Sequence, residues 1–137
     1  MSTPAAAARA AAAHAVSAVY RGRSLDAALA EIFSTSSPQL ADERALIQEM
    51  AYGALRWHFQ LLPLLHGFLE KPFKDKDADL EALLVIGFYQ LLHMRVAAHA
   101  AVKETVEATL VLKKDWAKGM TNAVLRRLLR EEAHIRT

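Results

Sequence analysis

The sequence predicts an all-α fold, a bundle of about seven helices in one domain that spans residues 1–137. Alanine and leucine dominate the chain, which has only 5 glycines and 4 prolines in 137 residues. No stretch shows the alternation of β-branched and polar residues that is typical of a half-buried strand. Residues 82–89 carry no charge and lie within a segment of helical periodicity, Asp79–Met94. Because a helix that is apolar nearly all round is buried on most of its surface, we expect this segment to form the central helix.

A glycine lies in the middle of the expected central helix. Gly87 costs about 1 kcal/mol relative to alanine in a helix interior. That cost predicts that another helix crosses closely at this point, and the alternative is a tolerated glycine without a packing role. The apolar run is too short to span a membrane, which requires about 20 such residues. We therefore expect a domain without a membrane partner.

The first helix is expected to end near residue 20. Ser2 or Thr3 followed by Pro4 is typical of a helix start, and the alanine runs that follow have the highest helix propensity. Arg21–Arg23 ends the helix, with Gly22 in the C-cap role. Because alanine buries little area, the packing of this helix is expected from its larger apolar side chains, Val16, Val19 and Tyr20.

A second helix follows Ser24, which is a suitable capping residue. Its apolar face is formed by Leu25, Ala28, Leu29, Ile32 and Phe33. Ser34–Pro38 is expected to form a loop, and Asp42–Arg44 to open a third helix with its acidic residues at the positive end of the helix dipole. The core positions expected in that third helix are Ala45, Leu46, Met50, Tyr52, Gly53, Ala54, Leu55 and Trp57.

The remaining helix boundaries follow from proline and from charged segments. Proline blocks a continuous helix interior, so Pro63 predicts a break between Trp57 and Leu62, and a fourth helix then runs to about Glu70. Around the central helix, Lys71–Asp77 is expected as a charged loop and Arg95–Ala98 as a short connection.

Two helices are expected after the central one. The sixth runs from about His99 to Lys113, and its inward positions are Ala100, Val102, Val106, Ala108, Thr109 and Val111 or Leu112. The last covers roughly Ala117–Glu132 and has the clearest division into two faces. Its apolar face is formed by Ala117, Met120, Val124, Leu125, Leu128 and Leu129. Its polar face is formed by Lys118, Asn122, Arg126, Arg127 and Arg130.

Composition and motifs indicate a binding domain rather than an enzyme. The chain has no cysteine, which excludes thiol chemistry and disulfides. No glycine-rich phosphate loop, nucleophile elbow or His-Glu-x-x-His helix is present, so no catalytic residue and no metal ligand is predicted. The start of the chain lacks the pattern of a secretory signal, and the cytoplasm is the expected location.

Two basic clusters are the candidate binding residues. Net charge is +2, and residues 95–137 carry nine of the lysines and arginines against five acidic residues. The first cluster is Arg21 and Arg23, with Arg9 and with Tyr20 as a candidate to stack a base. The second is Lys118, Arg126, Arg127 and Arg130, with Lys113 and Lys114 just before it. The alternative is that these residues only solubilise the surface.

Four motifs resemble, in the same order, the N-terminal NusB-like domain of the small-subunit rRNA cytosine-5 methyltransferases, the Sun/Fmu family. The motifs are Tyr52-Gly53-Ala54-Leu55-Arg56-Trp57, Gly87-Phe88-Tyr89-Gln90-Leu91-Leu92-His93-Met94, His99-Ala100-Ala101-Val102-Lys103-Glu104-Thr105-Val106 and Asn122-Ala123-Val124-Leu125-Arg126-Arg127. The resemblance covers the whole chain. It implies a NusB-like bundle, the fold that the antitermination factor NusB has as a separate protein.

The resemblance implies partners and a cofactor outside this chain. The parent enzymes methylate a cytosine of rRNA with S-adenosylmethionine, and that chemistry needs a cysteine nucleophile. This chain has no cysteine and no βαβ unit for the cofactor, so it resembles the accessory domain without the catalytic one. The implied partners are rRNA, the protein's own C-terminal methyltransferase domain and a ribosomal protein.

The resemblance departs from NusB in the first helix. There NusB carries an arginine run that belongs to its RNA-binding surface, whereas Arg9 is the only arginine within Ala5–Ala10. Three hypotheses therefore remain. The chain recruits rRNA for a methyltransferase, it is a separate antitermination factor, or it docks on the catalytic domain without touching RNA.

Overall fold

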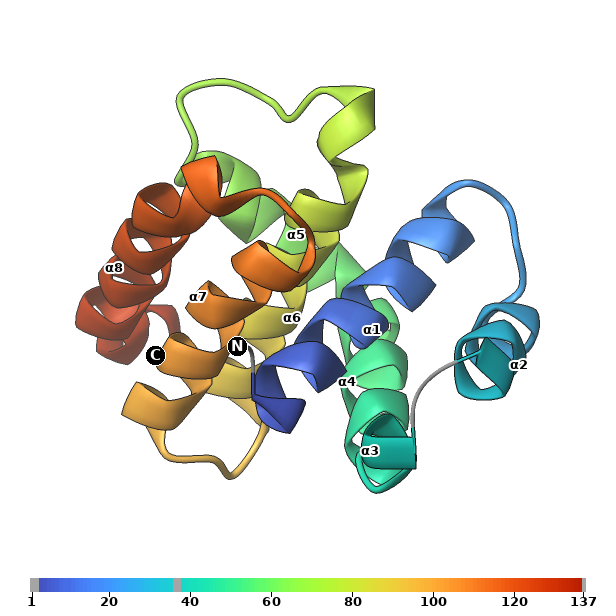
Figure 1. The fold of residues 1–137 in the computed structure, drawn as a ribbon. Helices are drawn as coiled ribbons and strands as arrows, with labels where there is room; N and C mark the ends of the chain where they lie inside the picture. The colour runs from blue at the N-terminus through green and yellow to red at the C-terminus, as the bar shows by residue number, and fades with distance from the viewer. Residues whose placement is uncertain (1–2, 36–37, 137) are drawn as a thin grey trace.

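The computed structural model describes residues 3–35 and 38–136, without the side chains of Gln39 and of residues 133–136. Within these ranges the chain forms α-helices and two 3₁₀ turns (Figure 1). The elements are α1 (Pro4–Tyr20), α2 (Leu25–Thr35), α3 (Pro38–Ala41), α4 (Arg44–Arg56), α5 (His58–Gly67), η1 (Asp75–Asp77), α6 (Ala78–His93), α7 (Ala98–Val111), η2 (Asp115–Ala117) and α8 (Lys118–Arg136). Since α3 is one turn of 4 residues, the prediction of an all-α bundle of about seven longer helices is confirmed.

Helix α6 is the centre of the bundle, as the sequence predicts. It packs against α1, α4, α5, α7 and α8, and Figure 1 shows it enclosed behind α1 and α7. Leu80 and all residues from Ala82 to Leu92 are buried. A helix buried on every side has no polar face to orient it, so its position is set by the apolar faces of the helices around it.

Two glycines allow helices to approach α6 closely. A Cβ atom at Gly87 would lie 2.7 Å from Leu125 Cδ2 of α8 and 3.2 Å from Thr105 Cγ2 of α7. The close crossing predicted at Gly87 is therefore confirmed. A Cβ atom at Gly53 of α4 would lie 2.0 Å from the Tyr89 ring, so the contact between α4 and α6 also depends on a glycine.

The alanines of α1 are core residues, which corrects the expectation that its larger side chains supply the packing. Val16 is fully buried, but Val19 and Tyr20 are only partly buried. The fully or almost fully buried alanines are Ala6, Ala8, Ala10, Ala11, Ala12, Ala13 and Ala15. Small side chains let α1 lie between α4, α6 and α7, where bulkier ones would hold these helices apart.

The ends of α1 agree with the sequence. Thr3 is the N-cap, and its hydroxyl accepts a hydrogen bond from the Ala6 amide at 3.0 Å, while Ser2 lies outside the described residues. Gly22 has a φ of 100°, and the Arg23 amide donates to the carbonyl of Ala18 at 3.1 Å. This is the left-handed helix ending that glycine favours.

The junction of α4 and α5 differs from its prediction. Ile47, Met50, Ala51 and Ala54 form the buried stripe of α4. Tyr52 lies off that stripe and is 50% exposed, Trp57 follows the helix and is 40% exposed, and Ala45 is exposed, so the core positions assigned to these three are wrong. The break falls at Trp57 within the predicted interval, but Pro63 lies inside α5. Because Pro63 is exposed, its ring is accommodated on the solvent side of that helix.

The other boundaries shift by a few residues. Helix α2 extends to Thr35, so of the predicted loop Ser34–Pro38 the first two residues are helical, and Ser36 and Ser37 lie outside the described residues. The turn α3 was not predicted, and α5 ends at Gly67 rather than near Glu70. In the part of the chain that the structure describes, no helix is both long and apolar enough to cross a membrane.

Candidate nucleic-acid interface

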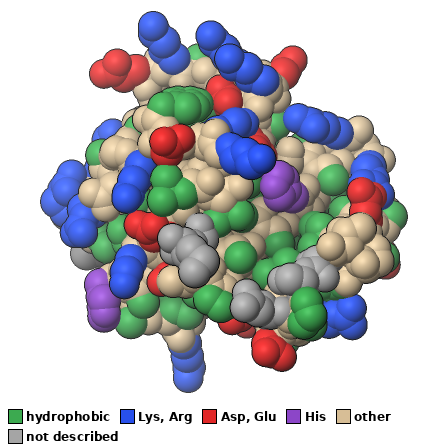
Figure 2. Space-filling view, in the orientation of Figure 1, with side chains coloured by type: hydrophobic (Ala, Val, Ile, Leu, Met, Phe, Trp, Pro, Cys, Tyr) green, Lys and Arg blue, Asp and Glu red, His purple; other side chains and the backbone are tan. Residues whose placement is uncertain are grey.

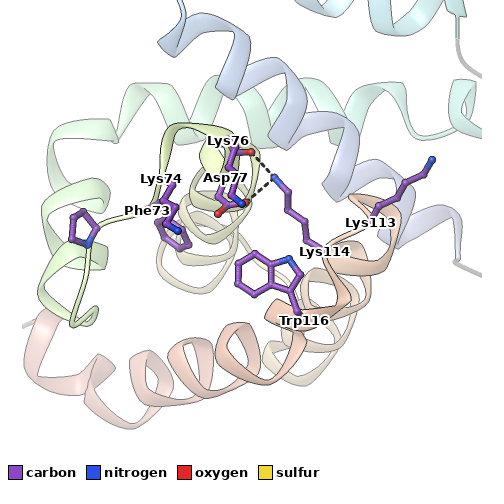
Figure 3. Close-up of a pocket in the computed structure, with 8 residues that line it drawn as sticks. Phe73, Lys74, Lys76, Asp77, Lys113, Lys114 and Trp116 are labelled. Atoms are coloured by element: carbon purple, nitrogen blue, oxygen red, sulfur yellow. Dashed lines mark hydrogen bonds and ion pairs between the residues drawn. The ribbon is translucent and has the colours of Figure 1, made fainter.

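The C-terminal ends of α1 and α7 carry basic residues in the same type of turn. After α7, the Lys113 amide donates to Leu110 O at 3.0 Å and the Lys114 amide to Thr109 O at 2.8 Å. Lys113 has a φ of 61°, the left-handed position that Gly22 holds after α1. This turn sends two adjacent lysines in different directions, and Figure 3 shows Lys114 directed toward η1 and Lys113 directed away from it.

Lys114 is committed to contacts within the protein. Its Nζ lies 3.2 Å from Asp77 Oδ1, is bonded to the Asp79 carboxylate, and donates to the Lys76 carbonyl at 2.7 Å. Burial disfavours the charged amine, but the hydrogen bonds that it donates to Asp79 and Asp77 outweigh this effect and raise the pKa of Lys114. Lys114 therefore joins α7 to the start of α6 and neutralises acidic charge there.

A hollow of about 580 Å³ opens beside this ion cluster. We call it the lysine hollow, and it is lined by Pro72, Phe73, Lys74, Lys76, Asp77, Lys113, Lys114 and Trp116 (Figure 3). Trp116 is 66% exposed. Within the described residues, Lys74, Lys76 and Lys113 have no ion-pair partner. Their charges are therefore available to an anion from outside.

A second hollow, of about 270 Å³, shares Lys76 with the first. It is lined by His14, Ser17, Ala18, Arg21, Arg23, Lys76 and Asp79. We call Arg21, Lys74, Lys76, Lys113 and Trp116 together the basic face. Arg23 lines the second hollow but pairs with Glu31 at 2.8 Å. Figure 2 shows lysine and arginine side chains around the whole outline of the molecule, and several of them, with acidic side chains in between, lie over the upper half, where the loop before η1 and the end of α1 are.

The second predicted cluster lies on α8, outside the two hollows of the basic face. Lys118 and Arg126 line a hollow of about 470 Å³ between α7 and α8. Lys118 Nζ lies 3.4 Å from Glu107 Oε1, and Arg126 Nε donates to Asn122 Oδ1 at 3.1 Å. Arg127 packs over the Phe68 ring and pairs with Glu131 at 2.7 Å. Arg130 is exposed and lines neither hollow of the basic face.

Arg9 does not lie on the surface, which corrects its assignment to an RNA site. The residue is 6% exposed, and its guanidinium donates through Nε and Nη2 to Gln90 Oε1 at 3.1 and 2.9 Å. Burial lowers the pKa of Arg9, and the charges of Glu104 and Glu43 partly oppose that effect. A guanidinium held inside the bundle is not available to a phosphate.

Tyr20 is also engaged within the fold. Its hydroxyl lies 3.1 Å from His58 Nδ1, and the two rings are tilted with centroids 5.3 Å apart. Burial and the nearby charge of Glu81 raise the pKa of Tyr20 to about 12. The ring is only partly exposed, so Trp116 offers a base far more open area than Tyr20 does.

The sequence contained a signal for the residues that were missed. Lys74 and Lys76 alternate with acidic residues, so the sequence indicated only a charged loop of mixed sign. Asp77 pairs with Lys114, which leaves Lys74 and Lys76 with one acidic neighbour in the loop, Asp75. Trp116 is a large apolar residue between Lys114-Asp115 and Lys118, and an aromatic residue among basic ones is typical of nucleic-acid surfaces.

The basic face has the chemistry of an anion-binding surface. In residues 3–35 and 38–132, no group of three or more metal-ligating side chains comes together. The basic face combines cations that have no ion-pair partner among the described residues with the exposed indole of Trp116. Lysines attract phosphates without regard to sequence, and an indole can stack on an unpaired base.

Lys113 occupies a position at which glycine is the less strained residue. A left-handed conformation costs other residues about 1–2 kcal/mol, while glycine adds about 0.4–1 kcal/mol of entropy to the unfolded chain. Lys113→Gly should therefore raise the free energy of unfolding by about 0.5–1 kcal/mol in urea titrations. The control is Gly22→Ala, which puts a side chain at φ 100°. This variant should have a lower free energy of unfolding than the unchanged protein. A less stable Lys113→Gly would contradict the assigned strain.

Comparison with known proteins places the chain in a family. The NusB family matches residues 6–130. Ribosomal RNA small subunit methyltransferase B of Pseudomonas putida is 48% identical over 127 residues, which cover 90% of this chain and 28% of that protein. The protein of the same name from Pseudomonas syringae pv. tomato is 48% identical, with 90% of this chain and 27% of the relative covered.

A third relative of the same name, from Vibrio vulnificus, is 44% identical over 114 residues, which cover 83% of this chain and 26% of the relative. The chain thus spans 26–28% of the length of these three proteins. The family match over residues 6–130 confirms the resemblance that the four sequence motifs indicated. This chain belongs to the NusB family.

Proposed function

We propose that this chain is the RNA-binding N-terminal domain of an S-adenosylmethionine-dependent small-subunit rRNA (cytosine-5) methyltransferase. In this role it helps to recruit or position rRNA in the cytoplasm. The relatives named above carry the name of an rRNA methyltransferase. The cysteine nucleophile and the cofactor site would come from a catalytic domain, because this sequence has no cysteine.

The observation that carries the proposal is the basic face. Its cations, Arg21, Lys74, Lys76 and Lys113, have no acidic partner among the described residues. They come from the end of α1, from η1 and the residue before it, and from the end of α7, which the fold brings to adjoining hollows. Four unpaired cations around one concave surface attract a polyanion, although net charge is only +2.

Charge reversal on the basic face tests the proposal. Lys74→Glu combined with Lys113→Glu should weaken binding of a small-subunit rRNA hairpin by about tenfold or more at low salt. The dependence of log K on log salt should become shallower by about 1.4, which is 0.7 for each phosphate contact on single-stranded RNA. Fluorescence anisotropy of a labelled hairpin measures both effects.

Two control variants make the result specific. Arg56→Glu with Arg95→Glu changes the net charge equally, and both residues are exposed and line neither hollow of the basic face. Their variant should bind almost as the unchanged protein does. Arg126→Glu with Arg130→Glu tests the second predicted cluster. Equal losses in all three variants would mean that only net charge matters, and no binding by the unchanged protein at low salt would refute the RNA role.

A docking role has a separate observation in its favour. At the junction of α4 and α5, Trp57 is 40% exposed and Phe59 is 90% exposed. Exposed aromatic residues on one side of a domain are typical of protein contacts. If this surface binds the catalytic domain, Phe59→Ser should weaken the association of the two separately expressed domains in calorimetry without RNA. Association that is insensitive to Phe59→Ser would contradict this alternative.

A separate antitermination factor that acts with a ribosomal protein is the third hypothesis. The names of the relatives favour the methyltransferase over this reading. Sequencing of the gene beyond the codon for Thr137 distinguishes the two. A downstream domain with a cysteine motif would exclude the antitermination factor.

A further inference from the structure

We propose that the lysine hollow is a subsite for one unpaired nucleotide, with its base stacked on Trp116 and its flanking phosphates on Lys74, Lys76 and Lys113. This inference rests on the proposed RNA-binding function and specifies the ligand as single-stranded RNA. The hollow of about 580 Å³ is within the range of roughly 300–1,000 Å³ that is typical of sites for small molecules.

Trp116 presents an open aromatic surface from a fixed backbone. The indole is 66% exposed, and no ring of the described residues stacks on it. Its neighbour Ala117 is completely buried, and the Ala117 amide donates to Lys114 O at 2.9 Å. The side chain is therefore held at the hollow by a rigid 3₁₀ turn while its face stays free. Figure 3 shows the indole beside Lys114, on the same hollow as Phe73.

The charges around the hollow are arranged for an anion at the rim. Lys114 pairs with both Asp77 and Asp79, so its own charge is used within the wall of the hollow and the cluster keeps one negative charge. The three unpaired lysines, Lys74, Lys76 and Lys113, line the same hollow from the residue before η1, from η1 itself and from the end of α7. Cations on two sides of an aromatic ring match a base with a phosphate on either side.

The geometry selects an unpaired base over a paired one. In a duplex both faces of each base are covered by neighbouring pairs, so an indole has no face to stack on. Bases in loops and bulges can be splayed out and stacked on aromatic side chains. Stacking accepts every base, so we expect this subsite to distinguish strandedness rather than sequence.

Tryptophan fluorescence gives a direct readout of the subsite. The chain has two tryptophans, and Trp57→Phe leaves Trp116 as the only one while keeping an aromatic ring against His93. A single-stranded oligouridine of about ten nucleotides should quench this variant to saturation. A duplex of the same length should quench it much less, because its bases are paired.

Substitution of Trp116 tests the energetic contribution. Trp116→Ala should weaken binding of the labelled oligouridine about tenfold, a size typical for the loss of one stacked base, and Trp116→Phe should have an intermediate effect. Trp57→Phe should bind as the unchanged protein does. The melting temperature of Trp116→Ala should not change, because the side chain is exposed.

The outcomes separate this inference from the proposed function. If Trp116→Ala binds oligouridine normally while Lys74→Glu with Lys113→Glu does not, the stacking subsite is refuted and the RNA-binding function stands. Equal quenching by single strand and duplex would also refute the subsite. If the unchanged protein binds no RNA at low salt, the function and the subsite fail together. Quenching of Trp116 only by the catalytic domain would show that this hollow is a protein contact instead.

Discussion

Gly87→Leu is expected to lower the free energy of unfolding by about 3 kcal/mol or more. A Cβ atom at this position would already lie 2.7 Å from Leu125 Cδ2 and 3.2 Å from Thr105 Cγ2, and leucine adds three further carbons. Insertion of extra methylenes into a packed core costs about 1–3 kcal/mol and sometimes more. The gain in helix propensity over glycine, about 1 kcal/mol, does not offset this cost.

Thermal unfolding followed by circular dichroism measures the effect of Gly87→Leu. With domain stabilities of about 5–15 kcal/mol, the variant should melt far below the unchanged protein or fail to fold. Gly119→Leu is the matched control, because a Cβ at Gly119 meets nothing within 4 Å and the position is exposed. An unchanged melting temperature for Gly87→Leu would mean that α7 and α8 do not cross α6 closely at this point.

The contrast between α6 and α1 shows which parts of the fold could be predicted. Helix α6 carries large apolar residues on every side, so its burial followed from the sequence. Helix α1 consists mostly of alanine on all sides, so the sequence shows no difference in hydrophobicity between its buried and exposed faces. Arg9 was therefore placed on the surface by the ordinary preference of charged residues. Its burial depends on Gln90, 81 positions away in the sequence, and no local pattern contains that pairing.

The candidate site was predictable only in pieces. Arg21 and Lys113 each follow a helix and were recognised as basic, but in different clusters. Their common surface arises because α1 and α7 pack against the same central helix. The segment Lys71–Asp77 was recognised only as a loop of mixed charge, and the sequence does not show that Lys114 pairs with Asp77 and Asp79. That ion cluster leaves Lys74 and Lys76 unpaired, and local composition cannot reveal which partner neutralises which charge.

A buried polar chain links three helices at the centre of the bundle. Arg9 of α1 donates twice to Gln90 Oε1 of α6, and Gln90 Nε2 donates to Thr105 Oγ1 of α7 at 2.9 Å. Arg9 Nη1 also donates to Ala5 O at 3.2 Å. Gln90 and Thr105 are completely buried. Their polar side-chain atoms cannot bond to water, so they depend on one another and on Arg9 for hydrogen bonds.

Gln90→Leu is expected to lower the free energy of unfolding by about 3 kcal/mol. The substitution keeps a side chain of similar size but removes the acceptor of two guanidinium N–H groups. Hydrogen bonds to charged groups contribute about 1.5–3 kcal/mol, and a buried charge left without its partner costs about 3–5 kcal/mol. Urea unfolding measures the change. A loss below about 1 kcal/mol would indicate that Arg9 reaches solvent or another acceptor.

The double variant Arg9→Met with Gln90→Leu should be more stable than Gln90→Leu alone. Burial lowers the pKa of Arg9, because a charged guanidinium is disfavoured away from water. Once Gln90 is absent, removal of the guanidinium relieves an unpaired buried group, and methionine fills much of the same volume. Arg9→Met alone should instead destabilise the protein, because it leaves Gln90 Oε1 without a donor. A double variant less stable than Gln90→Leu would show that the stem of Arg9 or its charge near Glu104 and Glu43 stabilises the fold independently of Gln90.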